Sequence, residues 1–239
     1  MRQKIQIVLV IGIAVAALRA GWIFYQRHEA NRQEQAKQQN APAPPLNADY
    51  YVTPKRLHAY DLKSARELIK QPVWVKEGYR YAYYAYDPAT RKASLGHEAG
   101  RLLPLQKIQV KDVVLAPSPG TAGQKQVLAV FQEDSKHYAF PVGTESSGDY
   151  RIYFDEMIFI EDPKDLYKHW PRDVWASIDN HEVKPGMNEL QADFAIGMGI
   201  PERSNDPGMK TVNYPNGGKP LSVTYRDGKA VDIKPATAA

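Results

Sequence analysis

Residues that could carry out chemistry are scattered along this chain of 239 residues. The six histidines occur singly, and none has a second histidine one helical turn away, the spacing on which a zinc protease depends. The chain has no cysteine, which excludes disulfides, thiol catalysis and cysteine-bound zinc. We therefore predict no metal site and no cofactor.

Two acidic pairs, Asp155-Glu156 and Glu161-Asp162, flank a short apolar run. Paired carboxylates can serve acid–base catalysis, but neighbouring side chains of a strand point to opposite faces, so solvated strand ends explain the pairs better. The stretch Gly197-Met198-Gly199 follows an expected helix and lacks the third glycine of a dinucleotide-binding loop, which favours a helix end. These patterns predict no catalytic residue, and we expect a protein that is not an enzyme.

A run of tyrosines is the most distinctive candidate for a binding surface. Tyr79, Tyr81 and Tyr83 would lie on one face of a strand, and Tyr84 and Tyr86 follow in the neighbouring register. Stacked tyrosines can form a platform for a peptide or a glycan, because each ring offers a wide apolar face and a polar tip. Packing in the core of a small β-domain is the alternative explanation of the same pattern.

The first element to place is an apolar run from Ile5 to Tyr25, which only two polar residues interrupt. About 20 apolar residues suffice for a helix to cross a bilayer, and Trp22 near the end of the run suits the interfacial aromatic belt. We predict a single transmembrane anchor helix in residues 1–25. A signal peptide cleaved after Ala17 is the alternative.

The net charge of +4 and the pI of about 9.0 are properties of the chain's beginning. The first 45 residues carry six Lys/Arg and two Asp/Glu, and the remainder carries 25 of each. This basic excess suits anionic lipid headgroups and gives no argument for a nucleic-acid partner. We expect a single-pass protein of the bacterial inner membrane with its folded domains in the periplasm, although the flanking charges do not settle the orientation.

The folded part is expected to begin after a polar, proline-containing linker at residues 26–56. A short helix should follow Asp61, which is a suitable cap. Residues 57–165 then read as a β-rich domain, for which we predict an SH3-like small barrel. Its strands are predicted from β-branched and aromatic content at Val73 to Tyr86, Leu105 to Leu115, Gln126 to Gln132, Tyr138 to Val142 and Tyr150 to Ile160.

Residues 166–239 return to helices before a final set of strands. One helix should start at Pro171, and a second at Asn188, where Gln191 completes a capping box. Gly199 is expected to end the second helix in a left-handed conformation. Three strands are then predicted, at Lys210 to Tyr214, Leu221 to Arg226 and Lys229 to Ile233. The fold class expected for the whole chain is α+β.

The run Lys184-Pro185-Gly186-Met187-Asn188, the helix after it and Gly199-Ile200-Pro201-Glu202 resemble the SmpA/OmlA (BamE-type) module. In that family a glycine-methionine pair precedes a helix that ends in glycine-x-proline. The resemblance covers about residues 172–235 and implies an envelope protein that helps to assemble outer-membrane β-barrels. This chain differs by lacking a lipidated cysteine.

These patterns together predict a membrane-anchored binding or assembly factor of the cell envelope, without catalytic activity. Its partners would be the membrane, through residues 5–25, and a protein or the cell wall. A peptidoglycan-binding protein that uses the tyrosine strand is the alternative.

Overall fold

The computed structural model describes residues 19, 21–23, 25–29, 32, 48–204, 206 and 208–236, and it divides the chain into two units, Met1–Asn47 and Ala48–Ala239. In the first unit the described residues are helical. No helix within the described ranges is both long and apolar enough to cross a membrane. The predicted transmembrane helix is therefore not supported, and most of the run from Ile5 to Tyr25 lies outside the described residues.

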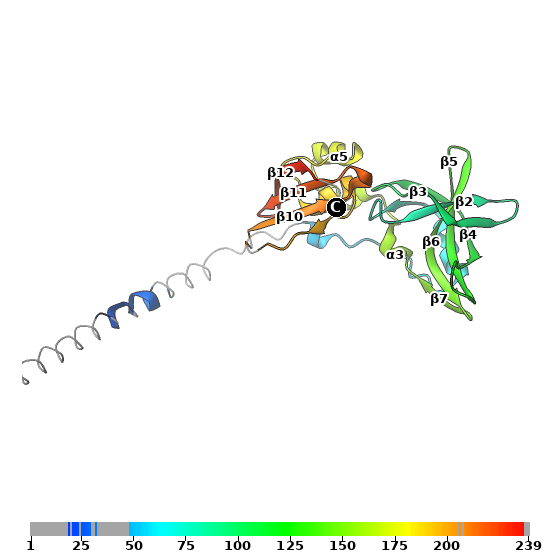
Figure 1. Ribbon diagram of the computed structural model, residues 1–239, viewed down its shortest axis with the longest axis horizontal. Coiled ribbons are helices and arrows are strands. Elements are labelled where there is room, and N and C mark those ends of the chain that lie inside the picture. The colour runs from blue at the N-terminus through cyan, green and yellow to red at the C-terminus, as the bar shows by residue number, and fades with distance from the viewer. Residues whose placement is uncertain are drawn as a thin grey trace, which may run out of the picture. The chain divides into compact units, whose positions relative to one another are not determined.

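The first sheet of the second unit holds eight antiparallel strands (Figure 1). Seven follow the order β3-β2-β6-β5-β4-β1-β8, and β7 pairs with β6. A helical segment formed by α2 (Leu62–Ala65) and η2 (Arg66–Lys70) precedes the sheet, and α3 (Phe154–Met157) connects β7 to β8. The strands are β1 (Pro72–Val75), β2 (Ala82–Asp87), β3 (Lys92–Arg101), β4 (Lys107–Pro117), β5 (Gln124–Glu133), β6 (Lys136–Ser146), β7 (Asp149–Ile152) and β8 (Ile158–Phe159).

This sheet buries apolar side chains on both faces, because its central strands are nearly continuous apolar runs. In β5 every residue from Val127 to Phe131 is buried. One face packs with Leu68 and Phe154 in the main core, and the other packs around Val114 and Leu128 in a smaller cluster. The predicted cap of the first helix is confirmed, since the Asp61 side chain accepts a hydrogen bond from the Ser64 amide.

The prediction of an SH3-like barrel is wrong, because this sheet stays open. Within the described residues β3 and β4 do not pair, and the path of paired strands ends at β3 and β8. The single strand expected from Val73 to Tyr86 is also divided, since β1 and β2 are separated by a turn in which Tyr79 has a φ of 62°. The strand β3 was not predicted.

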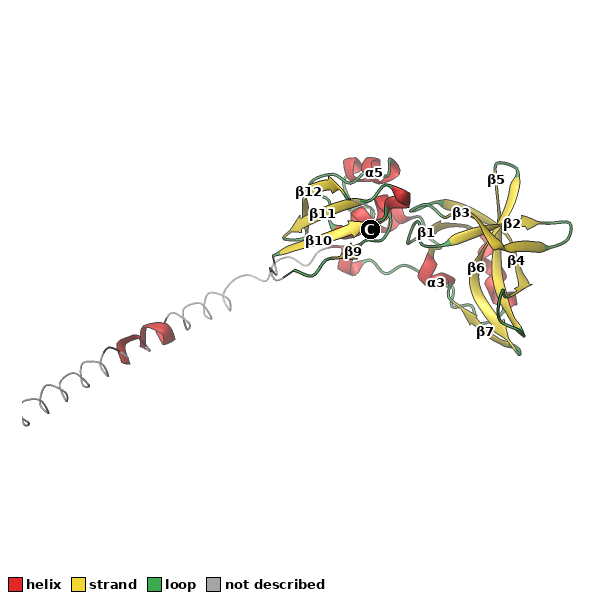
Figure 2. Cartoon of the chain, in the orientation of Figure 1, coloured by secondary structure: helices red, strands yellow, loops and turns green. Residues whose placement is uncertain are grey.

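The second sheet has four strands in the order β12-β11-β10-β9 and is covered on one face by helices (Figure 2). The two predicted helices and three predicted strands are present, and β9 is an additional short edge strand. The strands are β9 (Ile200–Pro201), β10 (Met209–Tyr214), β11 (Leu221–Arg226) and β12 (Lys229–Pro235); the helical segments are α4 (Pro163–Leu166), α5 (Arg172–Asp179), α6 (Glu189–Ile196), η1 (Ala48–Tyr51) and η3 (Asn216–Gly218).

The start of α6 is as predicted, but its end is not. Asn188 caps the helix and exchanges hydrogen bonds with Gln191, which confirms the capping box. The left-handed backbone expected at Gly199 occurs instead at Gly197, the C-cap, with a φ of 83°. A glycine at Gly199 is required for a different reason, close packing: a Cβ there would lie 2.8 Å from Cε1 of Tyr214.

Candidate functional site: a groove at the end of the second sheet

A groove of about 700 Å³ lies at one end of the second sheet. Antiparallel pairing places its residues in rows across the strands, because side chains directly opposite one another share a face. Asn213 of β10 lies opposite Ile200 of β9 and opposite Ser222 of β11. These three side chains therefore share the sheet face away from the helices.

The walls of the groove are mostly apolar and stiff. Ile200 is two-thirds exposed (66%) although it is a large aliphatic side chain. Pro215, Pro220 and Pro235 also line the groove, and each proline ring fixes its backbone φ near −65°. Apolar walls that are already rigid lose little conformational entropy when a ligand is bound.

One end of the groove is polar and carries a negative charge. The Asn213 side-chain amide donates a 2.7 Å hydrogen bond to Oε1 of Glu202, and Ser222 lies nearby in the lining. Glu202 is itself held beside β10, because its backbone N–H donates to the Thr211 carbonyl. Glu202 is the only charged residue among the described residues that line the groove, so this end favours a hydrogen-bond donor or a cation.

Buried polar groups support the groove from the core side of the sheet. Tyr214, which contributes to the lining, is 1% exposed, and its hydroxyl lies 2.8 Å from the Tyr225 hydroxyl. Burial, followed by the charge of Glu189, raises the pKa of nearby Asp193 to about 7, against weaker opposing contributions from the Gly199 amide and the Tyr214 hydroxyl. Oδ1 of Asp193 is buried and has no hydrogen-bond partner among the described residues. Such a carboxyl group is costly when it is ionised.

The tyrosines of the predicted platform are distributed among different surroundings. Tyr81 and Tyr83 pack against the main core of the first sheet, where the Tyr83 ring lies edge-on to Phe131 at 5.6 Å. Tyr86 belongs to the cluster on the opposite face. The remaining two, Tyr79 in the turn and Tyr84 in β2, are half-buried. The structure does not bring the five rings together on one exposed face.

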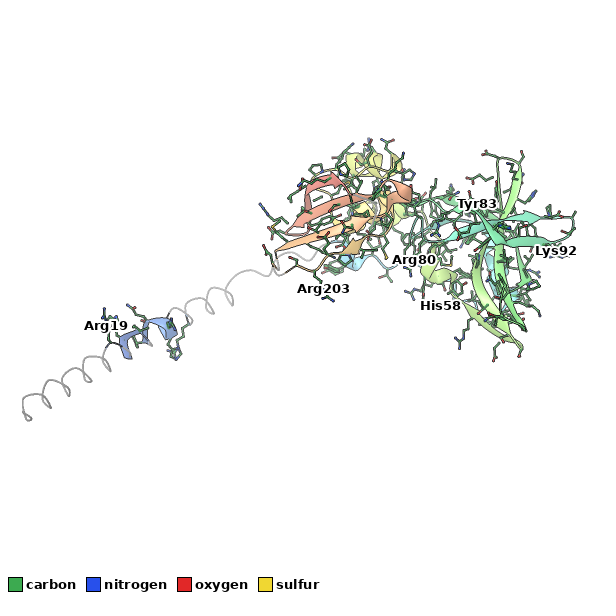
Figure 3. All side chains as sticks on the ribbon, in the orientation of Figure 1. Arg19, His58, Arg80, Tyr83, Lys92 and Arg203 are labelled. Atoms are coloured by element: carbon green, nitrogen blue, oxygen red, sulfur yellow. The ribbon has the colours of Figure 1, made fainter. Side chains whose placement is uncertain are left out.

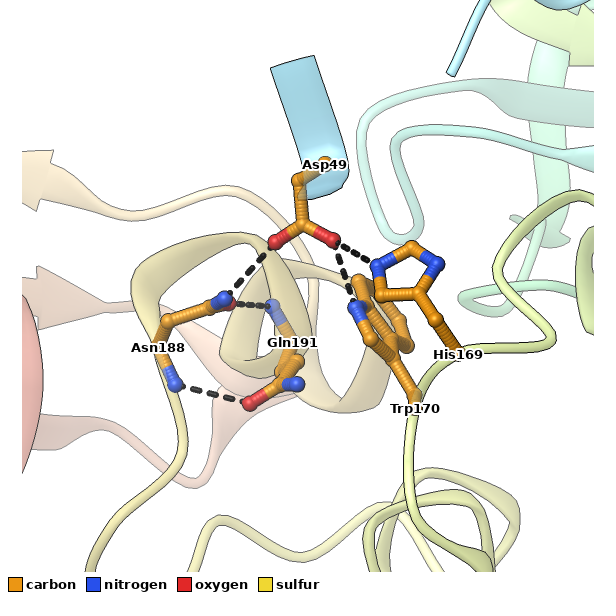
Figure 4. Close-up of polar contacts among 5 residues, drawn as sticks. All are labelled: Asp49, His169, Trp170, Asn188 and Gln191. Carbon is orange, nitrogen blue, oxygen red and sulfur yellow. Dashed lines mark hydrogen bonds and ion pairs between the residues drawn. The ribbon is translucent and has the colours of Figure 1, made fainter. Parts of the chain in front are cut away.

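A partly buried network around Asp49 could not be recognised in the sequence (Figure 4). Oδ1 of Asp49 accepts hydrogen bonds from the Trp170 indole and from His169 Nε2, both at 2.6 Å. Oδ2 accepts from the Asn188 amide at 2.9 Å. The network joins η1 to the cap of α6 across more than a hundred residues of sequence. Only the capping box could have been read from local spacing.

The described residues contain no group of three or more histidine, aspartate or glutamate side chains placed to hold a metal ion. The groove thus offers apolar surface, hydrogen bonds and one carboxylate. No family model matches the chain, and neither the curated proteins nor the solved structures contain a match.

Proposed function

We propose that this chain is a non-catalytic binding protein that holds a short extended segment of a partner protein in the groove of its second sheet. The observation that carries the proposal is the groove itself, where rigid apolar walls meet a small set of polar groups. This combination, at a volume of about 300 to 1,000 Å³, is typical of ligand sites in proteins.

The lining also indicates what the segment should contain. An apolar side chain would lie against Ile200 and the prolines, where it removes exposed apolar surface from water. A lysine, an arginine or a backbone amide would donate to Glu202, whose second oxygen can accept a further hydrogen bond. An acidic segment would be disfavoured, because none of the described residues that line the groove is basic.

The cell-envelope setting is part of this proposal and rests on the resemblance of residues 172–235 to SmpA/OmlA modules. An assembly factor needs a surface that engages another protein without altering it covalently. The groove would serve that purpose. The peptidoglycan alternative receives less support, because the tyrosines on which it depended are divided between the two faces of the first sheet.

The proposal can be tested by NMR chemical-shift mapping on the full chain with acetylated hexapeptides. Each peptide carries one leucine next to lysine, glutamine or glutamate. We expect the lysine peptide to shift the amides of Ile200, Asn213 and Ser222 most strongly and the glutamate peptide to shift them least. Ile200→Asp should remove these shifts. Glu202→Gln should abolish the preference for lysine.

Val231→Asp is the matched control, because Val231 is also an exposed aliphatic residue of this sheet (48%) but does not line the groove. Equal loss of binding in the Ile200 and Val231 variants would contradict the proposal. A chain that ends at Ala236 shows whether residues 237–239 compete for the groove. Shifts caused by soluble peptidoglycan fragments but not by peptides would favour the cell-wall alternative.

A further inference from the structure

A second surface arises where the first sheet fails to close. Going from β3 to β4 through β2, β6 and β5, every neighbouring pair is antiparallel. Four reversals of direction leave β3 and β4 pointing the same way. Closure would therefore require a parallel pair, and the described residues contain no pairing between these two strands.

The two strands nevertheless lie next to each other along a seam. At its beginning, the Arg91 guanidinium forms an ion pair with Asp112 at 3.2 Å. Farther along, Ala93 and Leu95 of β3 pack against the cluster that contains Val114 and Ala116 of β4. Side chains rather than backbone hydrogen bonds connect the strands here.

A hollow of about 350 Å³ lies along this seam, and both strands contribute to its lining. From β3 come Ala93 and Leu95, and from β4 come Leu115 and Ala116. The hollow runs from the basic residues Arg91 and Lys92 toward the turn that follows Pro117, and Lys92 lies at the outer end of the β2–β3 hairpin (Figure 3).

Both strands that flank the hollow have an edge that pairs with no other strand in the described part of the chain. The ten-residue strand β3 pairs only with β2. The outer edge of β4 pairs with β1 only through Lys107–Gln109. Farther on, side chains bond both backbone groups of Val113, because Arg66 donates to its carbonyl and Asp112 accepts from its N–H, and an insert would have to displace them or begin beyond Val113. Native edges are commonly protected by lysine or proline. The stretch of β3 from Ala93 to Gly100 contains neither.

We propose that this seam is a slot for one extended segment of a partner protein, which inserts between β3 and β4 and runs antiparallel to both. An antiparallel insert satisfies both edges at once, since β3 and β4 have the same direction, and it completes the sheet without a parallel pair. Alternate side chains of the insert would face the hollow, where Leu95 and Ala116, which belong to the same face of the sheet, favour apolar residues. Lys92 at the mouth favours a carboxylate on the insert.

This slot is separate from the groove of the second sheet and would provide a second point of attachment. Its test begins with selection of a peptide from displayed random sequences of about ten residues against the full chain. The selected peptide is then synthesised with N-methyl groups on either its odd-numbered or its even-numbered amides. N-methylation removes backbone donors without changing the side chains.

A strand held between two edges uses the amides of both sets, because successive N–H groups point to opposite sides. We expect each N-methylated peptide to bind at least about tenfold more weakly than the parent, by the loss of several hydrogen bonds. The substitution Leu95→Lys in the protein should weaken binding of the unmethylated parent peptide to a similar extent. Two control substitutions should leave the affinity for the parent peptide unchanged. They are Leu103→Lys, at an exposed leucine of the same half of the chain, and Ile200→Asp, in the groove.

Hydrogen exchange of the backbone amides in the complex should slow at residues 93–96 and 113–116 together. If only one of the two N-methylated peptides loses affinity, the peptide pairs with a single strand edge, and the proposal of a slot between β3 and β4 is wrong. No loss for either set would mean recognition by side chains alone and would also overturn it. Concentration-dependent dimers that Leu95→Lys abolishes would assign the seam to a second copy of this chain, against our proposal.

Discussion

At the scale of single residues, Asp193 is a carboxyl group held in largely buried surroundings. Its carboxyl group lies among Glu189 of its own helix, Lys210 and Tyr214 of β10, and Tyr225 of β11. Glu189 and Lys210 form an ion pair with each other at 2.7 Å, so the lysine is not free to neutralise Asp193. The pKa of about 7 follows mainly from burial.

This raised pKa makes stability depend on pH. Because the folded state binds the Asp193 proton more tightly than the unfolded state, the stabilising contribution is present at low pH and is lost as pH rises from the ordinary value of 3.8 toward about 7. We expect the Asp193→Asn variant to have the same free energy of unfolding as the parent protein at about pH 4, and a higher one at about pH 8. A pKa shift of this size corresponds to a difference of at most about 4 kcal/mol in the free energy of unfolding.

Urea unfolding at a series of pH values measures this difference, and Asp165→Asn, at an exposed aspartate, is the control. A gap between Asp193→Asn and the parent that does not widen from pH 4 to pH 8 would show that the carboxyl group titrates normally.

Asp49 is the opposite case, a carboxylate whose charge is compensated by three donors. Asp49→Ala leaves the Trp170 indole and the Asn188 amide with unmade hydrogen bonds. We expect a loss of about 2 to 4 kcal/mol in the free energy of unfolding, because hydrogen bonds to charged groups contribute more than neutral ones. The measurement is chemical denaturation at neutral pH. A loss below about 0.5 kcal/mol, the usual effect at an exposed surface site, would argue against a stabilising network.

At the scale of elements, the end of α6 depends on two glycines with different tasks. Gly197 has the positive φ, and a Cβ there would also lie 2.6 Å from the Gly78 carbonyl oxygen. Gly199 lies against Val212 and Tyr214 with no space for a side chain. The chain leaving the helix therefore passes close to β10 because one residue permits the turn and the other permits the contact.

The contact at Gly199 predicts a specific sensitivity. Gly199→Ala should lower stability by about 1 to 3 kcal/mol, since overpacking forces neighbouring side chains to move. Gly208→Ala is the comparison, because the nearest atom to its added Cβ would be Oδ1 of Asp206 at 3.4 Å. Thermal melts of both variants provide the measurement. Equal melting temperatures for the two variants would mean that the surroundings of Gly199 can accommodate a Cβ, against this prediction.

Elements with local signals were predictable, and elements defined by distant partners were not. Asp61 and Asn188 mark the starts of their helices, because each forms a capping box with a residue only three positions away. The strand β3 has few β-branched or aromatic residues, so its propensity is low, and its pairing with β2 holds it in place. The failure of the sheet to close could not be predicted either, because strand direction follows from the whole path.

Neither candidate surface could be predicted from the sequence, for a related reason. Ile200, Asn213 and Ser222 come from three strands, and no pattern links them until the register is known. The tyrosines formed a visible pattern, but packing distributes them.

At the scale of the whole molecule, residues 48–239 form one compact unit. We expect a chain that starts at residue 48 to melt at the same temperature as the full chain. A chain that starts at residue 53 should melt lower, because it lacks η1 and with it Asp49. Differential scanning calorimetry of the three chains checks this. A lower midpoint for the chain that starts at residue 48 would show that the first unit contributes to the stability of the second.

Phe159 makes contacts in both sheets. As part of β8 it pairs with Trp74 of the first sheet, and its ring packs 5.7 Å from Phe194 in the core of the second. Loss of order in either core would therefore remove contacts that Phe159 makes with the other. The two sheets should therefore melt in a single calorimetric transition, so a ligand held at the slot would protect the distant groove against unfolding as well.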